Sequence, residues 1–213
     1  VRSRGLGDVY KRQCEELSGI RRKNATVLTQ KLKDALIGLN FLTVEFDIAV
    51  RPGQTITAKG YDDVEFLIST NPGESLKPLS QVASGGELSR IMLAIKTVLA
   101  GRDEIDTLIF DEIDTGISGR TAWKVAEQLS VLSGAHQVIC ITHLPQIAAM
   151  ADVHFVIEKS STDDMTITDI HKVSAEESLA ELARLLGSDA LTEAALSNAK
   201  EMKEQAGMFK ETR

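Results

Sequence analysis

The chain has 213 residues, of which 43% are hydrophobic and 26% are charged, and its formal net charge is −7. This composition is typical of a soluble globular chain of one domain or one lobe of a larger domain, and the acidic balance excludes a surface that binds nucleic acid throughout. No apolar run approaches the roughly 18 residues of a membrane-spanning helix, and the two cysteines, Cys14 and Cys140, predict no disulfide framework and a reducing compartment.

The first residues of the chain stand apart from the rest. Residues 3–13 read SRGLGDVYKRQ, and every position matches the in-frame translation of a sequencing adapter used in tagmentation. We therefore expect residues 1–13 to be non-native and the natural N-terminal part to be missing. The alternative is a native polar N-terminus.

An amphipathic helix follows. Its apolar residues recur at alternating spacings of three and four, which is a heptad seam, at Ala25, Leu28, Leu32, Ala35 and Leu39. Ser18 and Arg21 break the register upstream, so the seam is predicted to be short. Two interpretations stay open: a single amphipathic surface helix, or the end of a longer coiled coil over residues 14–42.

Strand patterns come next. Residues 43–50, TVEFDIAV, alternate strictly and predict a half-buried strand, and residues 64–70, VEFLIST, predict another. Residues 51–53, Arg-Pro-Gly, predict a turn, with a short strand at 55–57. Together these segments predict an antiparallel β-meander.

The remaining chain alternates short apolar strands with helices. Helices are predicted at 86–99, 120–132, 145–150, 174–186 and 189–205, and strands at 107–110, 138–141, 154–159 and 165–170, the last two as a hairpin around 160–164. Ser174 and Glu177 have the spacing of a capping box. This alternation predicts an α/β fold with a parallel sheet and functional groups at the carboxyl ends of its strands.

Residues 83–90, ASGGELSR, precede the first of these helices. Ser84 and Glu87 also fit a capping box, so a well-capped helix is one interpretation. In the other, the free N–H groups at the positive end of the helix bind an anion, which Gly85 and Gly86 let approach closely because no Cβ intrudes. The phosphate loop G-x-x-x-x-G-K-[ST] occurs nowhere in the sequence.

Two further segments place polar groups at strand ends. Residues 107–114, TLIFDEID, deliver the adjacent carboxylates of Asp111 and Glu112 after an apolar strand. Neighbouring residues on a strand point in opposite directions, so one carboxylate can face Mg²⁺ while the other orients a water; an acidic turn is the alternative. His143 ends a second buried strand, where it either contacts a phosphate at the same sheet edge or is structural.

In this order the three segments resemble the second half of an ABC-type ATPase head. ASGGELSR is similar to the signature motif, TLIFDE to Walker B, residues 113–119 (IDTGISG) to the D-loop, and residues 141–143 (ITH) to the switch-histidine segment. The resemblance implies that Asp111 helps to hold Mg²⁺, that Glu112 polarises the attacking water, and that His143 senses the γ-phosphate of ATP.

The same resemblance implies further contacts with ATP. They would come from signature and D-loop residues, namely Ser84, Gly85, Gly86, Glu87, Asp114 and Gly116. In this superfamily the signature contacts the nucleotide that the phosphate loop of the opposing head holds. The fragment alone lacks that loop and is expected to be inactive as an ATP hydrolase.

Longer stretches of the sequence narrow the resemblance to one family of ATPases. Residues 64–100, 108–119 and 141–159, with ELSR and THLPQ as their most specific parts, resemble the RecN family of bacterial DNA-repair proteins, which is related to the structural-maintenance-of-chromosomes (SMC) proteins. The resemblance spans residues 25–205. It implies the C-terminal lobe of an ABC ATPase head at residues 43–213, with a mostly parallel sheet, flanking helices and an antiparallel β part, preceded by a coiled-coil helix.

The family resemblance also implies partners and a location. They are a homodimer through ATP-sandwiched heads, DNA in the repair of double-strand breaks, and the cytoplasm at the nucleoid. Two alternatives stay open: a chromosome-organising ATPase of the same superfamily, or an interaction lobe that does not hydrolyse ATP.

Overall fold

The computed structural model describes residues 2–102, 104–162, 165–187 and 192–212. The chain divides into two compact units, Val1–Val98 and Leu99–Arg213. The described strands form one antiparallel sheet in the first unit, and a parallel pair and an antiparallel hairpin in the second. The predicted α/β class, with a parallel and an antiparallel part, is confirmed.

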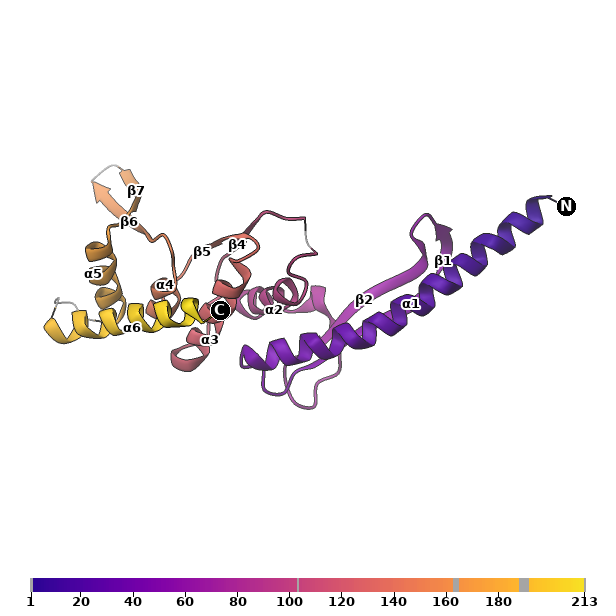
Figure 1. The fold of residues 1–213 in the computed structure, drawn as a ribbon, viewed down its shortest axis with the longest axis horizontal. Helices are drawn as coiled ribbons and strands as arrows, with labels where there is room; N and C mark the ends of the chain where they lie inside the picture. The colour runs from indigo at the N-terminus through magenta and orange to yellow at the C-terminus, as the bar shows by residue number, and fades with distance from the viewer. Residues whose placement is uncertain (1, 103, 163–164, 188–191, 213) are drawn as a thin grey trace. The chain divides into compact units, whose positions relative to one another are not determined.

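The first unit joins a long helix to a three-stranded sheet. Its elements in chain order are α1 (Arg2–Gly38), β1 (Glu45–Thr57), β2 (Gly60–Ser69), β3 (Lys77–Pro78), the 3₁₀ helix η1 (Leu79–Gln81) and α2 (Gly85–Val98) (Figure 1). The strands pair in the order β1-β2-β3, all antiparallel, as the predicted meander requires. The third strand is β3 and not the segment 55–57.

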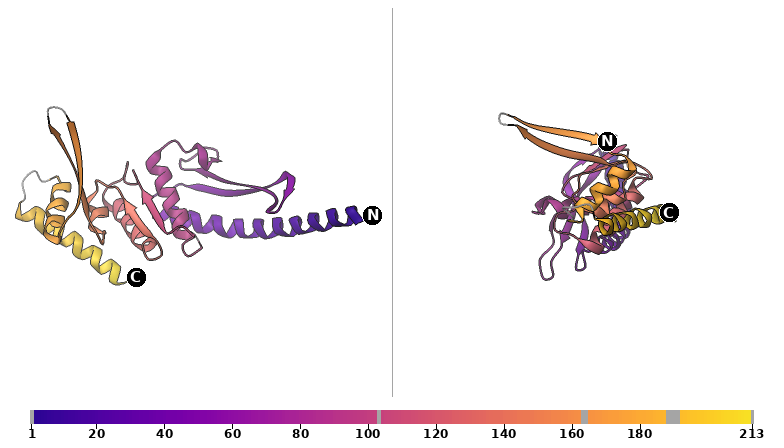
Figure 2. Two further views of the ribbon diagram at one scale, coloured as in Figure 1. Left: turned by 90° about the horizontal axis from the view of Figure 1, so that it is seen from above. Right: turned by 90° about the vertical axis from the view of Figure 1, so that its left-hand side faces the viewer.

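One face of α1 packs on β1 and β2, which run alongside it (Figures 1 and 2). The predicted seam lies on the buried side, where Leu32 and Leu39 are 0% and 2% exposed. Leu36 lies outside the predicted seam and is also fully buried, because a helix on a sheet buries a wider stripe than a coiled-coil seam. From β1 the core receives Phe46, whose ring centroid is 5.9 Å from that of Phe66.

The buried side of α1 continues toward the start of the helix, where its residues are more polar. The expectation that Ser18 and Arg21 end this buried side is wrong, since Ser18 is 1% exposed and Cys14, one turn earlier, is also buried. Arg21 is hydrogen-bonded to the β1–β2 hairpin: its Nη1 donates to Asp62 Oδ2 at 2.9 Å and its Nη2 to Lys59 O at 2.6 Å. Burial opposes the ionisation of Asp62, but the hydrogen bonds from Arg21 and Ser18, together with the positive charges of Arg21 and Arg22, outweigh burial and lower the pKa of Asp62.

The turn predicted at residues 51–53 is wrong, because β1 runs through them to Thr57. The pairing with β2 shifts register between Pro52 and Thr57, and such an irregularity is one of the few places where a strand accepts proline. Gly53 allows the two strands to approach closely, since a Cβ there would lie 2.5 Å from Tyr61 O. The chain reverses only after Thr57.

The second unit contains the alternating strands and helices. Its elements are β4 (Thr107–Phe110), α3 (Gly119–Leu132), β5 (Gln137–Cys140), α4 (Pro145–Ala149), β6 (Phe155–Thr162), β7 (Met165–Lys172), α5 (Ala175–Leu185) and α6 (Glu193–Glu211). These bounds agree with the predicted elements within a few residues, except that α6 ends six residues later than predicted. The predicted start of that helix at 189, and residues 163–164 of the hairpin turn, lie outside the described residues.

Helices α4, α5 and α6 share one apolar cluster of the second unit. Alanines let these helices approach closely in this cluster, which consists of Ala148, Ala149, Leu182, Ala183, Ala199 and Met202. Helix α5 begins with the predicted capping box, in which Ser174 N donates to Glu177 Oε2 at 2.7 Å and Glu177 N donates to Ser174 Oγ at 3.2 Å. The β6–β7 hairpin projects away from these helices (Figures 1 and 2).

Strands β4 and β5 form the predicted parallel pair, from Thr107 beside Gln137 to Phe110 beside Cys140. One face of the pair is bare. Phe110 is 6% exposed, whereas Ile109 on the other face is 68% exposed, and its neighbours Ile139 and Ile141 are 45% and 48% exposed. Parallel sheets are normally covered on both faces, so these isoleucines mark a surface that the described residues of the second unit leave uncovered. No described helix is both long and apolar enough to cross a membrane.

The N-terminal residues yield a first prediction. Residues 7–13 lie on α1 with exposed side chains, including Val9 and Tyr10. Deleting residues 1–13 is expected to shift the melting temperature by less than about 2 °C, because a change of ~1 kcal/mol moves it by ~2–4 °C in a chain of this size. Scanning calorimetry of the two chains measures the shift. A loss of several degrees would show that residues 1–13 are an integral part of the fold.

Candidate functional site

The segment ASGGELSR lies at the start of α2 in the first unit. Ser84 caps this helix: its Oγ accepts from Glu87 N at 3.4 Å and its carbonyl oxygen from Leu88 N at 2.9 Å. The reciprocal bond, from Ser84 N to the Glu87 carboxylate, does not form in the described structure, so only half of the predicted capping box is present. Because 3.4 Å is long for a hydrogen bond and both Ser84 and Gly85 are exposed, a bound anion can compete for these donors.

The rest of α2 anchors this helix start. Ile91 and Leu93 are fully buried, and the Arg90 guanidinium lies 5.5 Å from the centroid of the Phe41 ring. Burial lowers the pKa of Arg90. Arg90, the arginine of the ELSR segment, therefore packs against Phe41 within the first unit. This packing helps to fix the exposed start of α2 in place.

In the second unit, the chain turns sharply after β4. The strand ends at Phe110, so Asp111 and Glu112 are not successive strand residues, and the expected alternation of their side chains does not apply. Asp111 Oδ1 accepts from Glu112 N at 2.9 Å, and Glu112 has a φ of +57°. This left-handed conformation costs a residue with a Cβ roughly 1–2 kcal/mol and persists only where the surrounding structure supports it, as it often does at functional sites. Both acidic side chains are exposed.

Asp114 links this turn to the loop that follows β5. Its side chain is 4% exposed, and its Oδ2 lies 2.6 Å from Thr142 Oγ1, 2.8 Å from His143 N and 3.0 Å from His143 Nδ1. Leu144 N donates in turn to Thr142 Oγ1 at 3.0 Å. A buried carboxylate requires hydrogen-bond donors, and the bonds that it accepts from Thr142 Oγ1 and His143 N tie the two strand ends together.

The structure thus brings together four of the nine residues predicted for the site. Asp111, Glu112, Asp114 and His143 lie on the loops at one end of the β4–β5 pair, whereas Ser84–Glu87 belong to the first unit. The described contacts of the Asp114 carboxylate are internal. Gly116 has a φ of +75° in an exposed turn, which suits a glycine.

Thr142 is a member of this cluster that the sequence did not single out. The only signal was a hydroxyl residue placed directly before His143 at the end of a buried strand. Its pairing with Asp114 crosses 28 positions of the chain, a separation that no local pattern reveals.

The end of β5 is electronegative. Burial, followed by the carboxylates of Asp114 and Asp111, raises the pKa of the Cys140 thiol to about 12. Such a field favours a cation. Among the described residues no three His, Cys, Asp or Glu side chains gather as a metal site, but Mg²⁺ beside a nucleotide is usually held by one or two carboxylates with phosphate and water oxygens. Asp111 fits that ligand set.

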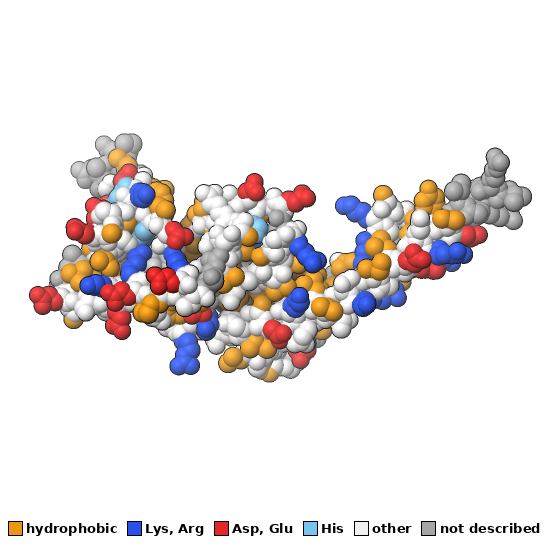
Figure 3. Space-filling model, viewed as in Figure 1, with side chains coloured by type: hydrophobic (Ala, Val, Ile, Leu, Met, Phe, Trp, Pro, Cys, Tyr) orange, Lys and Arg blue, Asp and Glu red, His pale blue; other side chains and the backbone are white. Residues whose placement is uncertain are grey.

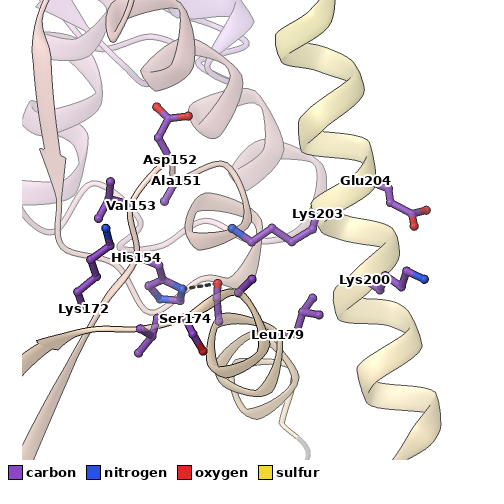
Figure 4. Close-up of a pocket in the computed structure, with 13 residues that line it drawn as sticks. Ala151, Asp152, Val153, His154, Lys172, Ser174, Leu179, Lys200, Lys203 and Glu204 are labelled. Atoms are coloured by element: carbon purple, nitrogen blue, oxygen red, sulfur yellow. Dashed lines mark hydrogen bonds between the residues drawn. The ribbon is translucent and has the colours of Figure 1, made fainter.

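A separate pocket of about 490 Å³ in the second unit is lined by none of these residues. Figure 4 shows Lys203 of α6 reaching toward His154, whose Nδ1 lies 2.8 Å from Ser178 Oγ. Burial and then Lys203 lower the pKa of His154, and Asp152 at the rim is paired with Lys210 at 2.5 Å. Acidic and basic side chains both line the pocket, and we propose no ligand or reaction for it.

Comparison with solved structures defines the class of fold. The Smc head domain with a coiled coil and joint from Pyrococcus yayanosii matches with a TM-score of 0.54 at 20% identity, covering 78% of this chain and 30% of that one. The Smc head domain of Pyrococcus furiosus, with an extended coiled coil and bound to the C-terminal domain of ScpA, gives 0.50 at 19% identity, covering 81% and 41%. The fold is that of part of an Smc-type head domain.

Sequence comparison identifies the family. The DNA repair protein RecN of Halalkalibacterium halodurans is 41% identical over 198 residues, which are 91% of this chain and 35% of that protein. RecN of Bacillus subtilis is 49% identical over 157 residues (74% and 27%), and RecN of Treponema pallidum is 54% identical over 143 residues (67% and 25%). This chain belongs to the RecN family, and it spans between a quarter and about a third of the length of these relatives. No protein-family model matches it.

The backbone of Glu112 yields a second prediction. Glycine adopts a positive φ without penalty, whereas a β-branched residue there is strongly disfavoured. Glu112→Gly is therefore expected to be at least as stable as the parent chain, and Glu112→Val to lose about 1–3 kcal/mol. Urea unfolding, followed by the fluorescence of the single tryptophan, Trp123, measures both. Equal stability of the two variants would mean that Glu112 does not hold this conformation in solution.

Proposed function

We propose that the complete protein is an ATP hydrolase of recombinational DNA repair, and that this chain supplies the signature, Walker B, D-loop and switch-histidine segments of its head. One contact carries this proposal. Asp114 Oδ2 joins the loops after β4 and β5, so Asp111, Glu112 and His143 share one end of a parallel sheet. That edge is where α/β proteins place their functional groups.

Each residue of this edge has a role that fits its position. Asp111 is the carboxylate that would hold Mg²⁺, and the ion would neutralise charge on the phosphates of ATP. Glu112 is exposed beside it and is the base that orients and deprotonates the attacking water. His143, with a side chain that is 71% exposed, contacts the γ-phosphate or the water next to it.

The start of α2 serves a nucleotide held by a second head. The Ser84 hydroxyl and the first N–H groups of the helix are suited to a γ-phosphate, and the exposed Gly85 permits a close approach, whereas Gly86 is buried. Because the sequence contains no phosphate loop with its lysine, we place the cradle for the other phosphates elsewhere in the complete protein. The exposed isoleucines of β4 and β5 suit a surface that the rest of the head covers.

The partners follow from the same assignment. Two heads would close around two ATP molecules as a homodimer and reopen after hydrolysis, in the cytoplasm at the nucleoid. DNA is proposed as a partner because the relatives are named DNA repair proteins. The charge pattern does not contribute to that proposal, since acidic and basic side chains are interspersed over the face shown in Figure 3. The match to RecN relatives at 41–54% identity, against 19–20% for Smc heads, favours repair over chromosome organisation.

Replacing Glu112 in the complete protein tests this function. Glu112→Gln keeps the shape of the side chain and removes the base, and a positioned base contributes roughly 10²–10⁴-fold to rate. We expect kcat for ATP to fall by about that factor while ATP still binds. Phosphate release and equilibrium binding of labelled ATP measure the two effects.

Two controls sharpen this experiment. Glu201→Gln, an exposed change of the same chemistry on α6, should leave the rate unchanged. The 213-residue chain alone is expected to show no hydrolysis, because its sequence contains no phosphate loop. Hydrolysis by the Glu112 variant at the parental rate would exclude Glu112 as the base.

A further inference from the structure

The hydroxyl of Thr142 makes two hydrogen bonds at the loop that follows β5. Its Oγ1 accepts from Leu144 N at 3.0 Å and lies 2.6 Å from Asp114 Oδ2. A main-chain N–H can only donate, so the hydroxyl is the acceptor in the first contact and its own hydrogen serves the second. One side chain therefore connects the main chain of this loop to the buried carboxylate in the turn after β4.

His143 is the central residue of this arrangement. A threonine hydroxyl that accepts from the N–H two residues later closes a local turn, and His143 lies between the two residues that the bond joins. Its own N donates to Asp114 Oδ2 at 2.8 Å. The main chain is thus held at His143 and directly after it, while the imidazole side chain is 71% exposed.

Regular secondary structure does not hold His143 in this way. Strand β5 ends at Cys140 and α4 begins at Pro145, so residues 141–144 lie outside both elements. Proline has no N–H to donate, and the N-cap residue Leu144 makes no side-chain cap. The direction in which the His143 side chain leaves the loop therefore depends on the bonds to Thr142 and Asp114.

We propose that Thr142 is a positioning residue for hydrolysis: its hydroxyl holds the turn that directs the His143 side chain at the sheet end carrying Asp111 and Glu112. The effect on hydrolysis rests on the proposed function, whereas the turn does not. The competing interpretation is that the hydroxyl only stabilises the loop. That interpretation predicts a less stable protein with an unchanged catalytic rate.

Two substitutions in the complete protein separate these interpretations. Thr142→Val keeps the branched shape and removes the hydroxyl, whereas Thr142→Ser keeps the hydroxyl and removes the methyl group. We expect Thr142→Val to lower kcat for ATP by up to about 100-fold, the loss that a shift of roughly 1 Å at a reacting group can cause. KM should stay unchanged, because the main phosphate cradle lies elsewhere, and Thr142→Ser should retain most of kcat. Steady-state phosphate release measures both constants.

Hydrogen exchange of the same proteins tests the turn without ATP. Mass spectrometry with fragmentation to single amides follows the exchange of Leu144 N. This exchange should be roughly two- to tenfold faster in Thr142→Val, which is the effect of losing one typical hydrogen bond. It should be nearly unchanged in Thr142→Ser. The amides of β4 and β5 report whether each variant is folded.

The other end of the same strand pair provides a matched control. Thr107 Oγ1 donates to Gln137 Oε1 at 2.9 Å, between two exposed residues at the starts of β4 and β5. Thr107→Val makes the same chemical change away from the loop, so it should alter neither the exchange of Leu144 N nor kcat.

Three results would overturn the positioning role: an unchanged exchange of Leu144 N in folded Thr142→Val, an unchanged kcat in that variant while Glu112→Gln is inactive, or equal losses of kcat in the valine and serine variants. If Thr142→Val does not fold, the parent protein decides, because a Leu144 amide that exchanges as fast as in an unstructured chain excludes the turn. If the complete parent protein does not hydrolyse ATP, the proposed function fails, and the exchange of Leu144 N alone decides whether the turn exists.

Discussion

The carboxylate of Asp114 is the contact on which the candidate site depends. Strands β4 and β5 pair over only four residues each, so the sheet alone does not fix the loops that leave it. One buried oxygen gathers Thr142 Oγ1, His143 N and His143 Nδ1 within 3.0 Å. Hydrogen bonds to a charged group that is shielded from water are among the strongest a protein forms, and unpaired donors at this place would be costly.

The burial of Asp114 also accounts for the turn that precedes it. The chain leaves β4 at Phe110 and has only three residues in which to bring Asp114 inward. The chain makes this sharp turn at Glu112, which has a φ of +57°. The turn is supported by the fully buried Ile113 and by a hydrogen bond from Thr115 N to Glu112 O at 3.1 Å. The unfavourable backbone of Glu112 is thus supported by its buried neighbours, and its carboxylate stays exposed beside Asp111.

Local patterns in the sequence predict much of this fold, and long-range pairs account for what they miss. The capping box at Ser174 and the parallel β4–β5 pair depend on spacing and apolar runs, and both are confirmed. The prediction that the buried side of α1 ends at Arg21 and Ser18 was wrong because the carboxylate that accepts a hydrogen bond from Arg21 lies 41 positions away, at Asp62. The role of Thr142 was missed for the same reason, since its partner is Asp114. The site residues themselves could be named from motifs, but their contacts could not.

The central claim is that the Ser84 segment of one head serves the nucleotide of another, and mixing two variants of the complete protein tests it most directly. Ser84→Arg places bulk and a cation where a hydroxyl and a γ-phosphate should meet; the second variant lacks the phosphate-loop lysine. Each alone should be inactive, yet a mixed dimer contains one site with both elements intact, so mixing should restore part of the hydrolysis rate. Absence of any recovery in proven mixed dimers, or loss of ATP binding by Ser84→Arg as a monomer, would contradict the account.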